Sequence, residues 1–248
     1  LWAAMEAEAF ISADIDHLID TGLSQIPKDC NVAKMIADIR VWHHDLPDWR
    51  DCRQKIQDHY GYDKYFGNCH VMPNHALMIM TMLYAPGDFS KGQMIVNTSG
   101  WDTDCNAGNV GCLHGIMLGL DGLNVGPDWR GPIADRMLIS SADGGNSIND
   151  AVRMAYYITN LGRQLDGKKV LDAPKAGAQF HFSLPGSVQG FQIAGGDGLV
   201  SASDSAIQIS SNGGTVTATS PMFAPLDVLR MRTYDLMASP LIYPGQKV

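Results

Sequence analysis

Residues 98–108 read TSGWDTDCNAG and place two carboxylates, with one residue between them, at the expected start of a helix. The first turn of a helix offers free N–H groups and the positive end of the helix dipole, and both hold carboxylates in place. Asp102 and Asp104 could therefore share a hard cation such as Mg²⁺, which prefers oxygen ligands. The alternative is that one of the two side chains only caps the helix.

The helix that follows is expected over residues 105–121 and is rich in glycine. Its glycines stand three or four residues apart, at positions 108, 111, 115, 119 and 122. Each glycine inside a helix costs about 1 kcal/mol relative to alanine. This pattern predicts a helix packed tightly against other backbone in a helical bundle. A buried helix of this kind, with two carboxylates at its start, would be a suitable platform for a central metal site.

Outward from this helix, apolar residues recur with the helical period over most of residues 1–172, for example between Val32 and Trp42. Further helices are predicted over residues 75–84 and 89–97. The period changes to two near the end of the chain, around residues 180–182 and 207–209, where Gly, Ser, Asn and Asp separate short β-rich runs. We therefore predict an all-α helical domain followed by a small all-β sandwich or jelly-roll module, over residues 1–170 and 171–248.

Composition excludes several classes of protein. The chain has 248 residues, 18 basic and 26 acidic residues and a net charge of −8. No basic cluster is visible, which argues against nucleic-acid and anionic-membrane partners. The most apolar run, residues 76–85, is about half of the ~20 residues that a membrane-spanning helix needs. Five cysteines without a C-x-x-C pair favour reduced thiols, and therefore a cytoplasmic protein, over a disulfide framework.

The chain begins at Leu1, without an initiator Met and already within a helical pattern. We expect it to be a fragment of a longer protein, so a signal peptide or a functional motif could precede it. The last strand signal, residues 241–243, is followed by only five residues, and the β-module could likewise extend beyond Val248.

The segment Gly100-x-Asp102-Thr103-Asp104-Cys105, with the spaced glycines after it, resembles a signature motif of the ADP-ribosylglycohydrolases, commonly G-x-D-T-D-T. The variant GWDTDCN resembles a bacterial branch of that family. The resemblance covers roughly residues 1–140, and only the Asp-x-Asp segment is specific. It implies an all-α fold with a binuclear Mg²⁺ centre in a cleft. The implied activity is hydrolysis of a glycosidic bond at C1 of an ADP-ribosyl group, in a small molecule or an ADP-ribosylated protein.

The resemblance also implies roles for single residues. Asp102 and Asp104 would be metal ligands, and Trp101, Cys105 and Asn106 would line the substrate site. Cys105 stands where the family usually has Thr or Ser, and a thiol is a poor ligand for Mg²⁺. Trp101 replaces a second glycine and would either form a wall of the cleft or pack in the interior. The family's Thr-Asp-Asp-type segment and its water-activating acidic residue have no match here, so catalytic residues are expected upstream of Leu1.

Two further candidates lie in residues 69–75, which are predicted to form a loop before an apolar helix. Asn74 fits the N-cap of that helix, whereas His70 could instead reach the cleft. Both are therefore candidate substrate-binding residues. Three functions are consistent with the sequence: Mg²⁺-dependent hydrolysis of a bond to ADP-ribose or a related ribosyl group, hydrolysis of another N- or O-glycoside, and a catalytically silent binding or structural role.

Overall fold

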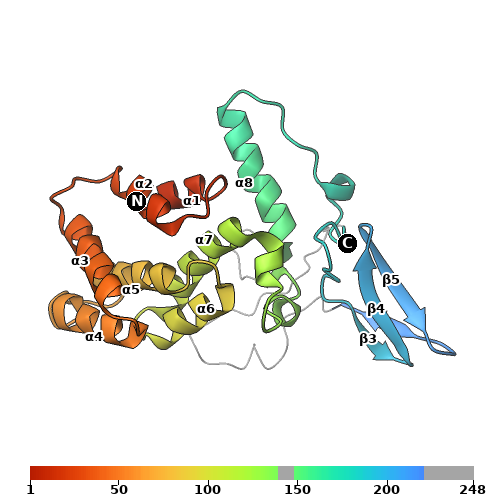
Figure 1. Cartoon of the computed structure of the whole chain (residues 1–248). Coiled ribbons are helices and arrows are strands. Elements are labelled where there is room, and N and C mark those ends of the chain that lie inside the picture. The colour runs from red at the N-terminus through yellow and green to blue at the C-terminus, as the bar shows by residue number, and fades with distance from the viewer. Residues whose placement is uncertain (139–147, 221–248) are drawn as a thin grey trace. The chain divides into compact units, whose positions relative to one another are not determined.

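The computed structural model describes residues 1–138 and 148–220 (Figure 1). The chain divides into two compact units, a helical unit over residues 1–127 and a second unit over residues 128–248. No helix of the described ranges is long and apolar enough to cross a membrane.

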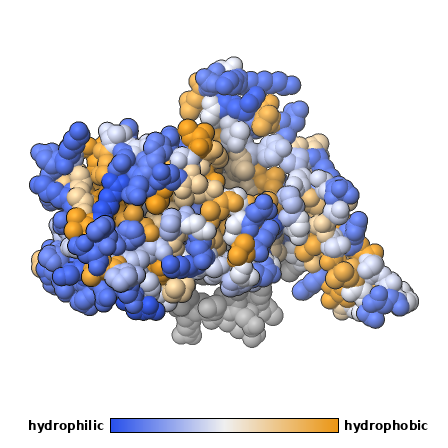
Figure 2. Space-filling view, viewed as in Figure 1, coloured by the Kyte–Doolittle hydropathy of each residue, from blue (hydrophilic) through white to orange (hydrophobic). Residues whose placement is uncertain are grey.

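Several helices of the helical unit begin at aspartate caps. Asp14, Asp48 and Asp88 each accept a backbone N–H of the helix that follows, as N-cap aspartates do. On the face seen in Figure 2, hydrophilic residues cover most of the surface at the lower left, where Figure 1 places α4. The helices are α1 (Trp2–Glu8), α2 (Ile15–Leu23), α3 (Asn31–Asp45), α4 (Trp49–Tyr60), α5 (Val71–Tyr84), α6 (Phe89–Thr98) and α7 (Thr103–Leu123).

Helix α5 is the centre of the helical unit and contacts α2, α3, α4, α6 and α7. Most of its residues are buried, because its sequence is apolar on all sides rather than along one stripe. The side chains packed around it include Leu18, Met35, Ile36, Ile56, Ile95 and Leu113, all fully buried. A side chain of this kind contributes about 1.5–3 kcal/mol when it is fully buried.

The start of α5 differs from the prediction. The N-cap is His70, whose Nδ1 accepts the N–H of Met72 at 3.1 Å, and Asn74 lies inside the helix. Residues 69–75 had been predicted to form a loop with Asn74 at the N-cap, yet the first turn of α5 begins at Val71 and includes Pro73. A proline in the first turn is tolerated, however, because the N–H groups of that turn have no partner within the helix.

The glycines of α7 do not pack as predicted. A Cβ placed at Gly108 or Gly115 would have no described atom within 4 Å, and Gly119, with φ +63°, interrupts the helix. Within α7 the buried residues are Asn106, Val110, Leu113 and His114. Gly108 and Gly115 therefore border open space within the described part of the chain, and the tight backbone packing inferred from the glycine spacing is wrong at these two positions.

The second unit combines one long helix with short strands. The described strands form three antiparallel pairs: β1 with β2, β3 with β6, and β4 with β5. The face-to-face sheets of a sandwich are not seen within residues 148–220, so the sandwich or jelly roll stays a prediction. The elements are η1 (Gly131–Ile133), β1 (Arg136–Leu138), β2 (Ile148–Asp150), α8 (Ala151–Leu165), η3 (Pro174–Gly177), β3 (Gln192–Gly195), β4 (Gly198–Ser203), β5 (Ala206–Ser211) and β6 (Thr217–Thr219).

Buried polar groups, rather than an apolar core, organise the described part of the second unit. Asp150, at the start of α8, accepts a hydrogen bond from His181 Nε2 at 3.1 Å, and both side chains are buried. Gln189 Oε1 accepts the backbone N–H groups of His181 and Phe182. The strand predicted around residues 180–182 is therefore an irregular segment, because its N–H groups bond to a side chain.

The division into compact units differs from the boundary predicted at residue 170. Helix α8 was expected in the helical domain, whereas it groups with the strands. The Asp150–His181 contact gives the physical reason, since it ties the start of α8 to the segment before β3.

Candidate metal centre

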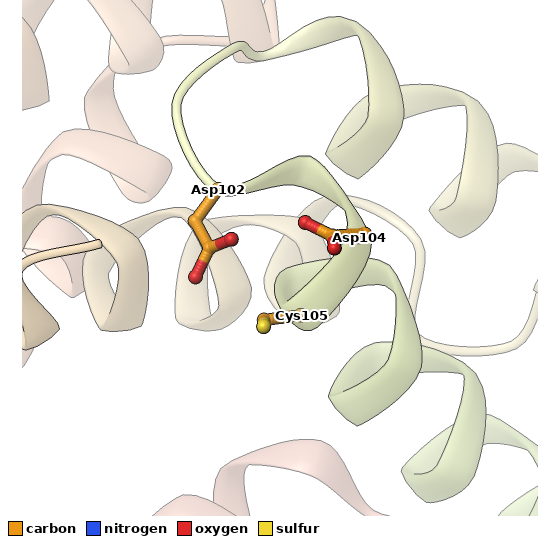
Figure 3. Close-up of side chains that lie close together, drawn as sticks. All are labelled: Asp102, Asp104 and Cys105. Atoms are coloured by element: carbon orange, nitrogen blue, oxygen red, sulfur yellow. The ribbon is translucent and has the colours of Figure 1, made fainter. Parts of the chain in front are cut away.

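Two carboxylates and one thiol meet at the start of α7. Asp102 occupies the N-cap position, and Asp104 and Cys105 lie in the first turn. One ligand atom of each residue lies within 4.8 Å of the others. Figure 3 shows the Asp104 carboxylate turned toward that of Asp102, with the Cys105 sulfur on the same side of the helix. Asp102 is half-buried and the other two are exposed, so the start of α7 is more open than the predicted buried platform.

The electrostatics of the pair follow from its position at a helix start. A hydrogen bond shared with Asp102, followed by the backbone N–H groups of Asp104 and Cys105, lowers the pKa of Asp104. A cation could take the place of the shared proton, since both side chains present oxygen atoms to the same space. The carboxylate pair therefore fits the hard divalent cation that the Asp-x-Asp motif predicts.

The thiols beside the pair do not fit that cation. A hydrogen bond to Asp102 and the charge of that carboxylate raise the pKa of Cys105. The pKa of Cys69 is raised mainly by loss of solvent around the thiol, and further by the charge of Asp102 and a hydrogen bond with it. A thiol that keeps its proton is a weak ligand, and Mg²⁺ discriminates against sulfur in any case. Cys105 is thus near the carboxylates without being a suitable magnesium ligand.

Asn74 and Asn106, both predicted to bind substrate, are hydrogen-bonded to each other. Asn106 Nδ2 donates to Asn74 Oδ1 at 2.9 Å, and the two residues are 2% and 5% exposed, respectively. The backbone N–H of Asp102 donates to the same Asn74 oxygen at 3.1 Å. His70 caps α5 and its ring lies 5.3 Å from that of Tyr65. These contacts support the start of α7.

Trp101 packs against neighbours of the same unit. Its ring stacks on Tyr62 with the ring centroids 5.2 Å apart and an interplanar angle of 12°. The Arg53 guanidinium lies over the same side chain at 4.3 Å. Trp101 is half-buried and also contacts the hydrophobic core. The geometry favours the packing alternative over a free cleft wall.

The sequence reasoning missed three neighbours of the site, Arg53, Tyr62 and Cys69. They come from α4 and from the loop before α5, about 35 to 50 positions before Asp102. No local pattern links them to the Asp-x-Asp segment. The sequence offered one indication that other elements pack here, which is Gly100 before Trp101. These two residues have φ angles of +83° and +62°, and such a backbone is held by tertiary contacts.

A helical unit with a carboxylate pair at a helix start defines a candidate cation-binding protein. The family model described as ADP-ribosylglycohydrolase matches residues 1–161, and the chain belongs to this family. No curated protein and no solved structure matches the chain. The family predicted from GWDTDCN is thus confirmed, whereas the bacterial branch stays a prediction. The match extends into α8, beyond the first compact unit.

Membership of this family indicates the type of reaction and of substrate. The family is metal-dependent and suggests hydrolysis of ADP-ribose glycosidic bonds. Its substrates are small molecules or ADP-ribosylated molecules.

Proposed function

We propose that the protein hydrolyses a glycosidic bond to ADP-ribose or a related ribosyl group in a Mg²⁺-dependent reaction. The observation that carries this proposal is the meeting of Asp102 and Asp104 within 4.8 Å in the segment that matches the family signature. We further propose a cytoplasmic location, on the basis of the cysteine pattern.

The residues of this chain have distinct roles in the proposal. Asp102 and Asp104 would hold the cation, which when bound supplies positive charge that orients and polarises an oxygen of the substrate or of water. The amides of Asn74 and Asn106 are engaged with each other, so we assign them to the support of the site. His70 and Trp101, which have contacts within the unit, are assigned in the same way.

The first test measures hydrolysis of an ADP-ribosylated protein against Mg²⁺ concentration, with the full-length protein. Asp102→Asn or Asp104→Asn keeps the side-chain size and removes a charge that the cation needs. We expect the rate to fall by about 100-fold or more. Thermal stability should change little, because relief of repulsion between close carboxylates offsets any lost contact. Asp121→Asn, near the other end of α7, is the matched control and should behave as wild type.

Cys105→Thr extends the same experiment. A hydroxyl oxygen would replace the thiol beside Asp102, so we expect full activity and a lower Mg²⁺ concentration at half-maximal rate. Unchanged rates and metal dependence in both Asp→Asn variants would contradict the assignment of the ligands. Product analysis with simple N- and O-glycosides separates the second candidate activity. The absence of any hydrolysis by the wild type would favour the silent binding or structural role.

A further inference from the structure

Asp102 differs from the other N-cap aspartates of the helical unit. The side chains of Asp14, Asp48 and Asp88 accept N–H groups of their own helices, whereas that of Asp102 does not. An aspartate that caps its helix spends its carboxylate on the backbone. The carboxylate of Asp102 is free of this task, so other groups must hold the start of α7.

Asn74 provides these groups from the neighbouring helix α5. Its Oδ1 accepts the backbone N–H of Asp102 at 3.1 Å and the side-chain amide of Asn106 at 2.9 Å. Its Nδ2 donates to the Tyr62 hydroxyl at 2.8 Å and to the His70 carbonyl at 2.9 Å. Both ends of the amide are therefore used. Only a side chain that carries both donor and acceptor groups can make these four bonds.

The same network reaches the residues just before Asp102. Tyr62 stacks on Trp101, and Arg53 lies over Trp101 and donates from Nε to the Ser99 carbonyl at 2.9 Å. Trp101 has a left-handed φ of +62°, a conformation that is unfavourable for a non-glycine residue. These contacts offset that cost and fix the backbone that enters α7.

We propose that Asn74 is a positioning residue of the metal centre, which holds the backbone of Asp102 so that its carboxylate stays available to the cation. This inference rests on the proposed function, in which Asp102 is a ligand. It gives Asn74 a role that differs from the substrate contact and from the helix cap predicted from the sequence.

The test measures Mg²⁺ affinity by isothermal titration calorimetry of the full-length protein, together with thermal stability. Asn74→Ala removes all four bonds, and loss of such a supporting partner typically weakens metal binding by about 10- to 100-fold. Tyr62→Phe removes one hydroxyl and should weaken binding by a few-fold, with the fold intact. Asn97→Ala is the matched control. Among the described residues the Asn97 amide bonds only to Gln93 within α6, so the Mg²⁺ affinity of this variant should equal that of wild type.

A double-mutant cycle separates positioning from a purely structural role. If Asn74 acts through Asp102, Asn74→Ala should weaken Mg²⁺ binding much less in an Asp102→Asn background than in the wild type. A structural role alone would lower the melting temperature and leave the affinity of the folded protein unchanged. That result, for Asn74→Ala or, if it does not fold, for Tyr62→Phe, would overturn the inference. A wild-type protein that binds no Mg²⁺ would instead contradict the proposed function itself.

Discussion

His75, the residue after Asn74 on α5, is 8% exposed, and its Nε2 has no hydrogen-bond partner in the described part of the chain. Burial lowers its pKa to about 4. Burial also lowers the pKa of His114 on α7. Both rings are thus held neutral inside the helical unit, whereas in the unfolded chain a histidine takes up its proton near pH 6.5.

This difference sets the sign of the response to acid. The stability that depends on a neutral His75 is complete above pH 6.5 and is lost as the pH falls from 6.5 toward 4, because only the unfolded chain then binds the proton. The loss should reach the order of 2–3 kcal/mol by pH 4. His75→Phe keeps a ring of similar size and should flatten the profile. Urea unfolding at pH 7.5, 6 and 5 measures the slope.

The control is His44→Phe, since His44 is exposed at the end of α3 and its replacement should leave the slope unchanged. An identical pH dependence in wild type and His75→Phe would show that His75 does not carry the acid response.

Single residues also show what could be predicted of the site. Asp102 and Asp104 were found from local sequence, because a helix start and an Asp-x-Asp spacing are local properties. The hydrogen bond that Asn106 donates to Asn74 could not be predicted, since it depends on how α5 and α7 pack. The contact of Trp101 with Tyr62 is tertiary in the same way. The residues of the candidate site could thus be predicted from the sequence, whereas the hydrogen bonds by which some of them hold others in place could not.

At the scale of elements, Gly92 of α6 and Gly115 of α7 should respond in opposite ways to replacement by alanine. A Cβ at Gly92 would lie 2.4 Å from Cε1 of His114, whose Nε2 is tied to the Ala85 carbonyl at 2.8 Å. The ring cannot easily move, so Gly92→Ala should cost about 1–3 kcal/mol through overpacking. A Cβ at Gly115 meets no described atom within 4 Å, so Gly115→Ala should stabilise α7 by up to about 1 kcal/mol.

The two glycine variants serve as controls for each other, and chemical denaturation measures both. Equal destabilisation by Gly92→Ala and Gly115→Ala would mean that α7 is packed as tightly at Gly115 as at its contact with α6. The glycine spacing alone could not separate these cases, because a glycine is equally compatible with a close neighbour and with open space. The positions of the helices were more predictable than the packing of the glycines, since apolar periodicity and aspartate caps are local properties of each segment.

At the scale of the whole molecule, the change from a helical to a two-residue period predicted where helices give way to strands. It did not predict where one compact unit ends and the next begins. Helix α8 has a helical sequence and lies in the compact unit that holds the strands. The family match runs to residue 161, within α8. That the family domain ends near residue 170 therefore stays a prediction. The contact that places α8, between Asp150 and His181, joins residues 31 positions apart, and no periodicity could reveal it.

The Asp150–His181 contact predicts how the two units unfold. Asp150 accepts the Arg153 N–H at 2.9 Å, which caps α8, and also the hydrogen of His181 Nε2. His181 Nδ1 accepts the Ser183 N–H at 3.0 Å, so Nε2 carries the hydrogen and Asp150 is its acceptor. Asp150→Ala removes the cap and leaves a buried donor unpaired. The second unit should lose about 2–4 kcal/mol.

Asp48→Ala is the matched variant in the helical unit, where it removes an exposed cap and should cost about 1 kcal/mol. Hydrogen exchange resolved by peptide should show faster exchange in α8 for Asp150→Ala, with α5 unchanged. Asp48→Ala should speed exchange in α4 and leave α8 unchanged. Because the two variants perturb different compact units, a matching loss of protection across both units in each variant would show that the chain unfolds as one cooperative body.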